Sequence, residues 1–591
     1  MKQIILACII FLCTTIQGNA QTTEYTISFE NAVHHEAEVK AVFSGLKKKE
    51  VTFRMSRTSP GRYAIHEFAK NVYNVRVTDS KGNVLNTTRP DPYSWSVKGH
   101  DGTLLVSYTL FANRGGGTYA QIDETHAHLN IPATFMYAPS LAKNEVKVTF
   151  NTREDLQWKV ATQLKYIEGN TYYAKDLQYF MDSPTEISNH SVRSFDVKKQ
   201  TVHFVLHHNG TEAELDTYFE KVKKLVIQQK KVFGELPSYD YDNYYFLACY
   251  IPNASGDGME HRNSTILTST RSLANGGLER NVGTVSHEFF HGWNVERIRP
   301  QSLEPFDFEA ANMSGELWFA EGFTSYYTSL MMRRAELISK EEYIKGLTGT
   351  FNYVWNSPGR SFFNPIEMSY QAPFVDAATS VDPVNRNNTF ISYYSYGSAL
   401  GLALDLSLRE KDLNLDDYMK LVWKKHGKKE KPYTIEDLHT LLNKYAGDSF
   451  GNHFFQNYIY KSDMPAMKRL FESVGVTLSQ DPNKVSFGVA VTNGAITQNT
   501  SIGTAAYKAG LEKGDKIIKV NNELITEGIS FKDMIALLSP NDVLNIVYER
   551  YGVSKETTAT LQQDPSYTIE INTSQKDRLI VKRRNLWLDP K

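Results

Sequence analysis

A short segment of the chain carries two histidines and a glutamate at a spacing that suits metal chemistry. Residues 285–291 read Val-Ser-His-Glu-Phe-Phe-His, a His-Glu-x-x-His pattern. Residues four apart lie on one face of an α-helix, so His287 and His291 could offer two imidazoles to one Zn²⁺. Glu288 lies beside them, where a carboxylate could act as general base. Because the pattern also arises by chance in long chains, it needs support from other residues.

A catalytic zinc ion needs three protein ligands and one open position for water. The best candidate for the third ligand is Glu321, 30 residues after His291 (321 minus 291), within the apolar segment 317–323. An unpaired carboxylate would be costly to bury there, and a metal ion or an arginine would compensate for it. Glu316 and Glu296 are the alternatives, but Glu316 lies on a different helical face and Glu296 follows the first helix too closely.

Two further positions could act on a peptide. Glu260 follows a predicted strand and a glycine turn, and a carboxylate there could bind the free α-amine of a peptide. An ammonium group held at a fixed distance from zinc would limit cleavage to the first peptide bond. A tyrosine near residue 394 could stabilise the oxyanion that forms on the carbonyl oxygen. The residues alone do not choose among Tyr393, Tyr394 and Tyr396.

The elements that position these residues follow from hydrophobic periodicity. Apolar residues at helical spacing predict a helix over 212–233, which Gly234 ends. The apolar run 244–251 predicts a buried strand, in which Cys249 is a core residue rather than a catalytic thiol. Residues 364–388, rich in Pro, Asp, Asn and Ser, predict a long loop. Further helices are predicted over 317–332, 394–410, 415–426 and 435–445.

The regions on either side differ in character. Residues 21–200 contain strand-like runs separated by turns, which predict an all-β, sandwich-like domain. His126 and His128 alternate on one such run and are expected to be surface or core residues rather than ligands. Residues 484–562 resemble a PDZ domain, in which backbone N–H groups of the Phe487-Gly488 loop would face a peptide carboxylate. A spacer that only packs on the rest is the alternative, and Trp587 in the tail could be a docking contact.

Composition excludes some classes of partner. The chain has 591 residues, with 65 Lys and Arg against 66 Asp and Glu. A net charge of -1 gives no reason to expect nucleic acid or an anionic membrane as partner. Residues 1–20 predict a signal peptide, because Lys2 precedes a short apolar run and small residues that suit cleavage. That run is too short for a membrane span, so we expect a protein exported to the periplasm or secreted.

These features together resemble the glycyl aminopeptidase family of gluzincin zinc metallopeptidases, the M-sixty-one peptidases. The similarity covers nearly the whole chain after residue 20. It rests on Ser-Pro-Gly-Arg-Tyr at 59–63, on His-Glu-Phe-Ala at 66–69, on His-Glu-Phe-Phe-His-Gly-Trp-Asn at 287–294, on the Glu321 segment and on the PDZ order. The resemblance implies one Zn²⁺ per chain, with His287, His291 and Glu321 as ligands and Glu288 as base.

The resemblance also implies how a substrate is held. Gly258-Met259-Glu260-His261 is similar to a Gly-x-Met-Glu-Asn exopeptidase motif, with His261 in place of Asn. Tyr394 matches the Tyr of a Tyr-x-Lys-Gly motif, with Tyr396 in place of Lys. The family's preference for N-terminal Gly or Ala is implied in the same way.

The sequence therefore predicts a multidomain α+β zinc aminopeptidase. Its partners would be peptide substrates and a C-terminal peptide bound by the PDZ domain. A PDZ-guided zinc endopeptidase and a non-catalytic peptide-binding scaffold are the alternatives. The predicted parts are a signal peptide (1–20), a β domain (21–200), a thermolysin-like, mainly helical metallopeptidase domain (201–475), a PDZ domain (484–562) and a tail (563–591).

Overall fold

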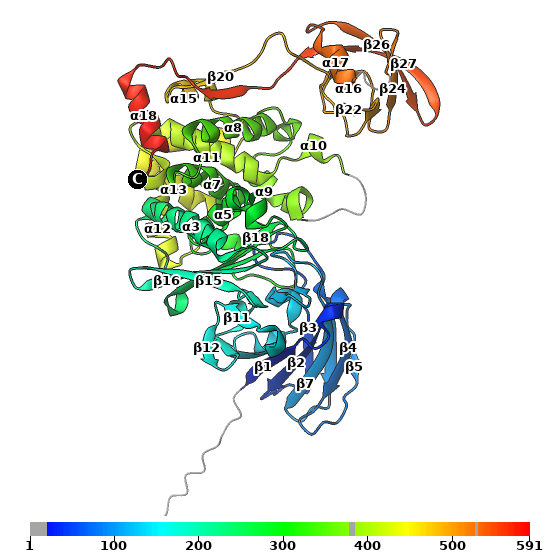
Figure 1. Cartoon of the computed structure of the whole chain (residues 1–591), viewed down its shortest axis with the longest axis vertical. Helices are drawn as coiled ribbons and strands as arrows, with labels where there is room; N and C mark the ends of the chain where they lie inside the picture. The colour runs from blue at the N-terminus through cyan, green and yellow to red at the C-terminus, as the bar shows by residue number, and fades with distance from the viewer. Residues whose placement is uncertain (1–20, 378–383, 526–529) are drawn as a thin grey trace, which may run out of the picture.

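The computed structural model describes residues 21–377, 384–525 and 530–591, so the predicted signal peptide lies outside the described residues. A β domain, a mixed sheet-and-helix domain and a small second β domain follow one another along the chain (Figure 1). This order confirms the predicted multidomain α+β class. No helix among the described residues combines the length and the apolar character that a membrane crossing requires.

The N-terminal domain is built on a large twisted sheet that packs against two smaller ones. Side chains alternate between buried and solvent-facing along β2 (Glu36–Ser44), which is the period of a half-buried strand. The inward residues include Val39 and Phe43, both fully buried. The large sheet has the order β12 (Lys165–Glu168), β13 (Thr171–Ala174), β10 (Val146–Asn151), β1 (Thr22–Ser28), β2, β7 (Thr103–Phe111) and β4 (Val72–Thr78).

A second sheet begins the catalytic region. Its order is β15 (Ser191–Val197), β16 (Gln200–His208), β17 (Asn243–Tyr250), β19 (Ser264–Ser269) and β18 (Asp257–His261). The three inner strands run parallel, while β15 and β18 are antiparallel edge strands. Because β15 and β16 form a hairpin, the predicted boundary at residue 200 falls inside one unit. We propose that the catalytic region begins with β15.

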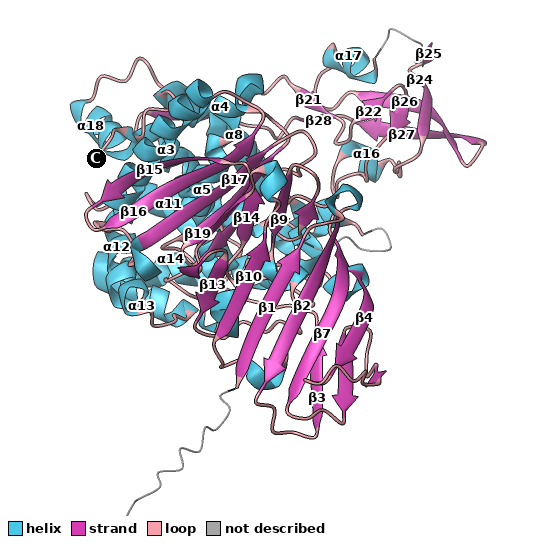
Figure 2. Cartoon of the chain, turned by 60° about the horizontal axis from the view of Figure 1, so that its bottom comes forward, coloured by secondary structure: helices cyan, strands magenta, loops and turns pink. Residues whose placement is uncertain are grey.

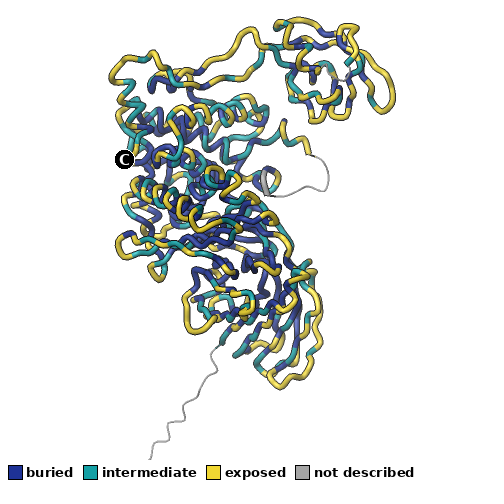
Figure 3. The backbone as a smooth tube through the Cα atoms, in the orientation of Figure 1, coloured by how far each residue is buried: buried dark blue, intermediate teal, exposed yellow. Residues whose placement is uncertain are grey.

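Helices cover one face of this sheet, and their buried sides form the interior of the domain (Figure 3). The first is α3 (Glu212–Phe233), with the predicted bounds. Thr211 and Glu214 form a capping box at its start, and Gly234 (φ 88°) ends it in the left-handed conformation. The others close to the site are α5 (Val282–His291), α6 (Leu317–Ala320), α7 (Gly322–Arg334) and α11 (Tyr393–Arg409).

Helices α7 and α11 cross with their backbones in contact. A Cβ atom on Gly322 would lie 2.3 Å from the Cα of Gly397, closer than any side chain allows. The two glycines therefore let the helices approach closely. Glu321 directly precedes Gly322, and Tyr394 lies one turn before Gly397. The crossing thus fixes the position of two predicted site residues.

The predicted loop over 364–388 is partly wrong. The structure places α9 at Pro365–Tyr370 and α10 at Arg386–Thr389, while residues 378–383 are outside the described residues. Asn364 caps α9 through a capping box with Glu367, and Pro365 occupies its first turn. Asn and Pro indicate loops by composition, but at a helix N-terminus the same residues start a helix.

The C-terminal β domain has a six-stranded sheet with two short helices, α16 (Ala505–Lys508) and α17 (Phe531–Ala536). The chain then returns to the catalytic domain, because β29 (Thr568–Ile571) pairs with β20 (Val476–Ser479). Both ends of the small domain are therefore held side by side at one place (Figure 1).

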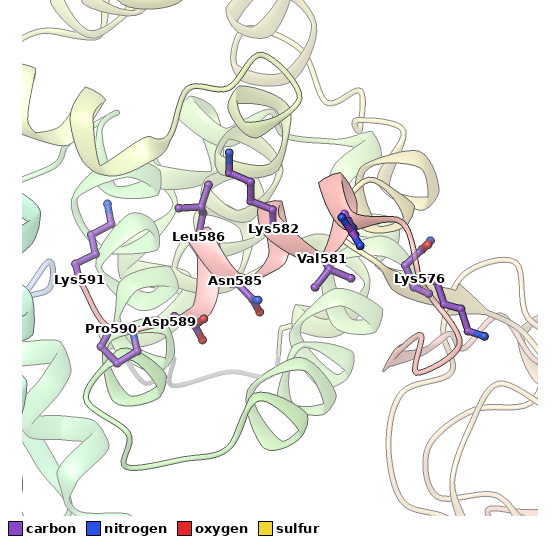
Figure 4. A pocket seen from close by; sticks show the side chains of 10 residues that line it. Lys576, Val581, Lys582, Asn585, Leu586, Asp589, Pro590 and Lys591 are labelled. Carbon is purple, nitrogen blue, oxygen red and sulfur yellow. The ribbon is translucent and has the colours of Figure 1, made fainter.

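The tail ends in helix α18 (Arg578–Leu588), which docks on the catalytic helices. Trp587 is fully buried, and its Nε1 donates a hydrogen bond of 2.9 Å to the Tyr326 hydroxyl. Its carbonyl oxygen accepts a hydrogen bond of 3.0 Å from Arg334 Nε. The outer side of the segment lines a groove of about 830 Å³, where Lys582, Asn585 and Leu586 are seen in Figure 4. The predicted docking contact of Trp587 is confirmed.

Replacement of Trp587 by alanine should destabilise the fold. The substitution would leave a cavity and remove the hydrogen bond from Trp587 Nε1 to Tyr326, with an expected cost of about 3–5 kcal/mol. Urea unfolding followed by circular dichroism would measure it. Leu586→Ala is the matched control, because Leu586 is 58% exposed and should change stability by less than about 0.5 kcal/mol. Equal midpoints for the two variants would contradict the docking role of the helix.

Candidate metal centre and active site

Helix α5 presents its two histidines to one point. The Nε2 atoms of His287 and His291 lie 3.1 Å apart, with the ring planes at 81°. Glu321, between α6 and α7, brings its Oε2 to 3.1 Å from His291 Nε2 and 3.6 Å from His287 Nε2. The structure therefore brings together the three residues that the sequence analysis selected as zinc ligands.

The Glu321 carboxylate gives a direct test of whether a metal fits. Its side chain is almost fully buried, and Oε2 has no hydrogen-bond partner among the described residues. A buried, unpartnered carboxylate oxygen is costly, and a cation beside it would remove that cost. Two imidazoles and a carboxylate are a donor set of catalytic zinc sites, with one position left for water or substrate. The residues thus fit a zinc ion.

Each ligand is oriented by a second contact. His287 Nδ1 lies 3.1 Å from the Thr328 hydroxyl, and His291 Nδ1 lies 2.6 Å from the Asn294 carbonyl oxygen. A bond at Nδ1 fixes the ring so that Nε2 faces the metal position. Asn294 is held in turn, because its amide group donates to the carbonyl oxygens of Phe319 and Ala320. This links α5 to the helix that ends at Glu321.

The β domain supplies a residue to the centre that residue-by-residue reasoning missed. The hydroxyl of Tyr63 donates a hydrogen bond of 2.7 Å to Glu321 Oε1. Tyr63 is 258 positions away in sequence and lies in the Ser-Pro-Gly-Arg-Tyr segment. The family resemblance singled out that segment but assigned it no role. The two Glu321 oxygens therefore have different tasks, since one faces Tyr63 and the other faces the imidazoles.

Glu288 lies in a closely fitted space against β18. A Cβ atom on Gly258 would come within 2.2 Å of Glu288 Oε1, so a larger residue there would displace the Glu288 side chain. Burial raises the pKa of the Glu288 carboxyl well above its usual value. Nearby His291 opposes the shift, while Glu260 and Glu321 add to it. A carboxyl with a raised pKa is suited to accept and return a proton near neutral pH.

Strand β18 brings Glu260 to the same place. Ligand atoms of Glu260, Glu288 and His291 all lie within 4.8 Å of one another. Met259 is fully buried, and its sulfur atom packs against the Gly61 backbone of the β domain. His261, which stands where the related motif has Asn, lies 2.8 Å from the Asp182 carboxylate.

A cavity of about 490 Å³ opens beside the centre, between the β domain and the catalytic domain. Arg62 lies at its wall and pairs with Asp257 at 2.5 Å. The larger groove at α18 contains none of the predicted site residues, so we take the smaller cavity as the substrate space. Its lining includes Arg62, Tyr63, His66, Tyr119, Asp257 and Tyr394.

The structure separates the three candidate tyrosines. The ring of Tyr394 lies 5.9 Å from the ring of His287 and lines the cavity. Tyr393 also lines it, and its ring packs on Tyr394 and Tyr63 at centroid distances of 4.9 and 6.0 Å. Tyr396 is fully buried and its hydroxyl has no hydrogen-bond partner among the described residues. The geometry favours Tyr394 as the tyrosine that reaches a substrate.

The alternative third ligands point elsewhere. Glu316 Oε2 accepts hydrogen bonds from Ser314 and Ser302 at 2.7 and 3.1 Å. Glu296 lies near Arg299, at 4.0 Å. Neither glutamate belongs to a group of potential metal ligands within residues 21–377, 384–525 and 530–591.

The predicted peptide-binding loop of the PDZ domain lies far along the chain from this centre. Phe487 is buried, and its ring packs on Phe531 of α17 at 4.7 Å. Gly488 has φ 88° and lies against Thr504, where any Cβ would clash. The binding of a peptide carboxylate by the backbone N–H groups of this loop stays a prediction.

Comparisons with known proteins agree with this arrangement. Residues 24–189 match the Peptidase M61 N-terminal domain, residues 280–400 match the M61 glycyl aminopeptidase model, and residues 466–547 match the PDZ domain. No curated protein matches the chain.

Two solved structures match the chain, and the first of them is similar in fold. An aminopeptidase N family protein from Idiomarina loihiensis is 23% identical, with a TM-score of 0.84, over 96% of this chain and all of that one. An M1 zinc metallopeptidase from Deinococcus radiodurans is 12% identical, with a TM-score of 0.43, over 75% of this chain and 94% of that one.

The chain has a His-Glu-x-x-His helix, with a carboxylate beside its two histidines, and it matches a peptidase family model. These features define a metallopeptidase. Its N-terminal and catalytic regions match the two M61 peptidase models, and a region that matches the PDZ domain follows them.

Substitution of Gly258 by alanine should disable the centre without removing any ligand. The added methyl group would displace Glu288 by roughly 1 Å, and kcat/KM for a peptide substrate should fall by about 100-fold or more. Gly349→Ala is the control, because a Cβ atom there also meets nothing within 4 Å and Gly349 does not line the cavity. Near-equal activity of the two variants would show that the position of Glu288 does not matter.

Proposed function

We propose that the protein is a zinc-dependent aminopeptidase that removes N-terminal residues from peptides. The observation that carries this proposal is the position of Glu260, within 4.8 Å of both Glu288 and a metal-ligand atom of His291. A carboxylate so close to the scissile bond can bind the substrate's α-ammonium group and thereby select the first peptide bond. The orphaned oxygen of Glu321 and the three-residue donor set support zinc, with one ion in this centre.

The roles of the residues follow from their positions. When bound, zinc supplies a Lewis acid that polarises the substrate carbonyl and lowers the pKa of a water molecule. Glu288 accepts the proton of the attacking water and returns it to the leaving amine. Tyr394 donates a hydrogen bond to the carbonyl oxygen as negative charge develops. Tyr63 holds Glu321 in place, and the backbone of Gly258 and Met259 flanks the substrate's first residue.

A preference for N-terminal Gly or Ala is part of the proposal. The family model supports it, and so does the crowding near the amine anchor. Gly61 and Met259 are in close contact beside Glu260, so little width remains for a larger first side chain. A small side chain would therefore be accepted more easily than a large one.

The remaining domains are assigned by the same reasoning. We propose that the PDZ domain binds a C-terminal peptide through the Phe487-Gly488 backbone and delivers substrates or partners. We also propose the predicted limits of 484–562 for this domain and 563–591 for the tail. Export, to the periplasm or beyond, rests on the predicted signal peptide at residues 1–20.

Metal removal tests the proposal directly. Hydrolysis of glycyl and alanyl anilides should be lost after treatment with a chelator and return when zinc is restored. Glu288→Gln should keep its zinc, measured by mass spectrometry of the metal, yet lose at least about 1,000-fold in kcat because the base is missing. An active chelated protein would refute metal catalysis, and an active Glu288→Gln variant would refute the assigned base.

The amine anchor has its own test. Glu260→Ala should lower kcat/KM for substrates with a free N-terminus by about 100-fold, because a buried charge pair is lost. Peptides with an acetylated N-terminus should be cut poorly by both forms. Glu279→Ala is a control, since the side chain of Glu279 is largely exposed. Internal cleavage of blocked peptides at a rate equal to the free ones would instead favour an endopeptidase.

A further inference from the structure

A second group of potential metal ligands lies where the β domain meets the catalytic sheet. It comprises His126, His207 and Cys249, whose ligand atoms all lie within 4.8 Å of one another. His126 is on β9 (His126–Leu129), while His207 and Cys249 are on neighbouring strands β16 and β17. Each of the three is at least nine-tenths buried. The reaction proposed above uses none of them.

Glu186 lies beside the group on the β-domain side, where its two oxygens lie 3.3 Å from His126 Nδ1 and 3.2 Å from His128 Nδ1. It lies on β14 (Thr185–Ser188), next to β9, and is 1% exposed. His126 Nδ1 in turn lies 3.7 Å from Cys249 Sγ. The rings of His126 and His207 stack with centroids 4.9 Å apart. Two residues thus come from each domain, at strands that lie side by side in Figure 2.

The spacing resembles that of the catalytic ligands. Direct ion-pair hydrogen bonds between N–H and carboxylate groups are usually about 2.7–2.9 Å long. Around a tetrahedral zinc ion, nitrogen and sulfur ligands lie roughly 3.3–3.8 Å apart, as follows from bond lengths of about 2.0–2.3 Å. The distances of 3.3 and 3.7 Å at His126 lie in that second range, as does 3.6 Å between His287 and Glu321, whereas His291 lies 3.1 Å from both His287 and Glu321.

We propose that His126, His207, Cys249 and Glu186 bind a second zinc ion, which joins the β domain to the catalytic domain. Two imidazoles, a thiolate and a carboxylate fill a tetrahedral shell with no open position, which is typical of a structural site. The thiolate and the carboxylate neutralise the two charges of the ion, so the buried group carries no net charge. Sequence reasoning expected His126 to be a surface or core residue and Cys249 to be a core residue, because their partners lie on distant strands.

The alternative to a second zinc site is an ion pair without metal between Glu186 and a protonated His126, with Cys249 as a neutral thiol. That arrangement is also neutral overall, so charge alone does not exclude it. It predicts one zinc ion per chain, in the catalytic centre. With the proposed site, the expected content is two zinc ions per chain.

Metal counting and cobalt spectroscopy distinguish the two arrangements. The purified full chain should contain two zinc ions, the Glu321→Ala and Cys249→Ser variants one each, and the double variant none. When Co²⁺ replaces zinc, a cobalt–thiolate bond gives an intense near-ultraviolet charge-transfer band. The catalytic centre has no sulfur ligand, so this band reports the second site alone and should persist in Glu321→Ala.

Matched variants keep the test decisive. Cys249→Ser and His207→Ala should abolish the cobalt band, while His203→Ala, four residues earlier on the same strand, should retain it. If a variant fails to fold, the zinc content and the cobalt band of the wild-type protein still distinguish the two arrangements. A single zinc ion with no thiolate band in the wild-type protein would overturn the proposal, as would a band that survives in Cys249→Ser. Neither result would affect the proposed aminopeptidase activity.

Discussion

The structure depends on a buried carboxylate whose two oxygens face opposite ways. Glu321 directs Oε2 toward the imidazole pair and accepts the Tyr63 hydroxyl at Oε1. Burying that charge is unfavourable unless both oxygens are satisfied. A bound metal ion would satisfy one, and Tyr63 of the β domain satisfies the other. The N-terminal domain is therefore part of the catalytic centre, although no residue of it was assigned a catalytic role.

Close backbone approach explains how such different elements meet at one point. Gly322 and Gly397 let α7 and α11 touch, which places Glu321 and Tyr394 near α5. Gly258 lets the edge strand β18 lie directly against Glu288. A methyl group on Gly322 would clash with the backbone of α11, and one on Gly258 would displace the Glu288 side chain. Precision comes from small residues next to the reactive ones rather than from the reactive residues themselves.

Local signals were predictable from the sequence, whereas long-range pairings were not. The bounds of α3 could be predicted because Thr211 and Gly234 are cap residues whose effect is local. The spacing of His287 and His291 needed only helix geometry. The prediction of a loop over 364–388 was partly wrong, because Asn and Pro are common both in loops and at the start of helices, as Asn364 and Pro365 are here. The contact of Tyr63 with Glu321 and the pairing of β20 with β29 link residues far apart in the chain, which no local pattern reports.

The antiparallel pair of β20 and β29 has a consequence for how the chain can be shortened. Because these strands hold both ends of the PDZ domain together, that domain is an insertion into the catalytic fold rather than a terminal appendage. Cutting the chain before the PDZ domain also discards β29 and the buried Trp587. Such a truncation would confound loss of ligand recognition with loss of stability. Excising the insertion and joining the two strands with a short turn would separate the two effects.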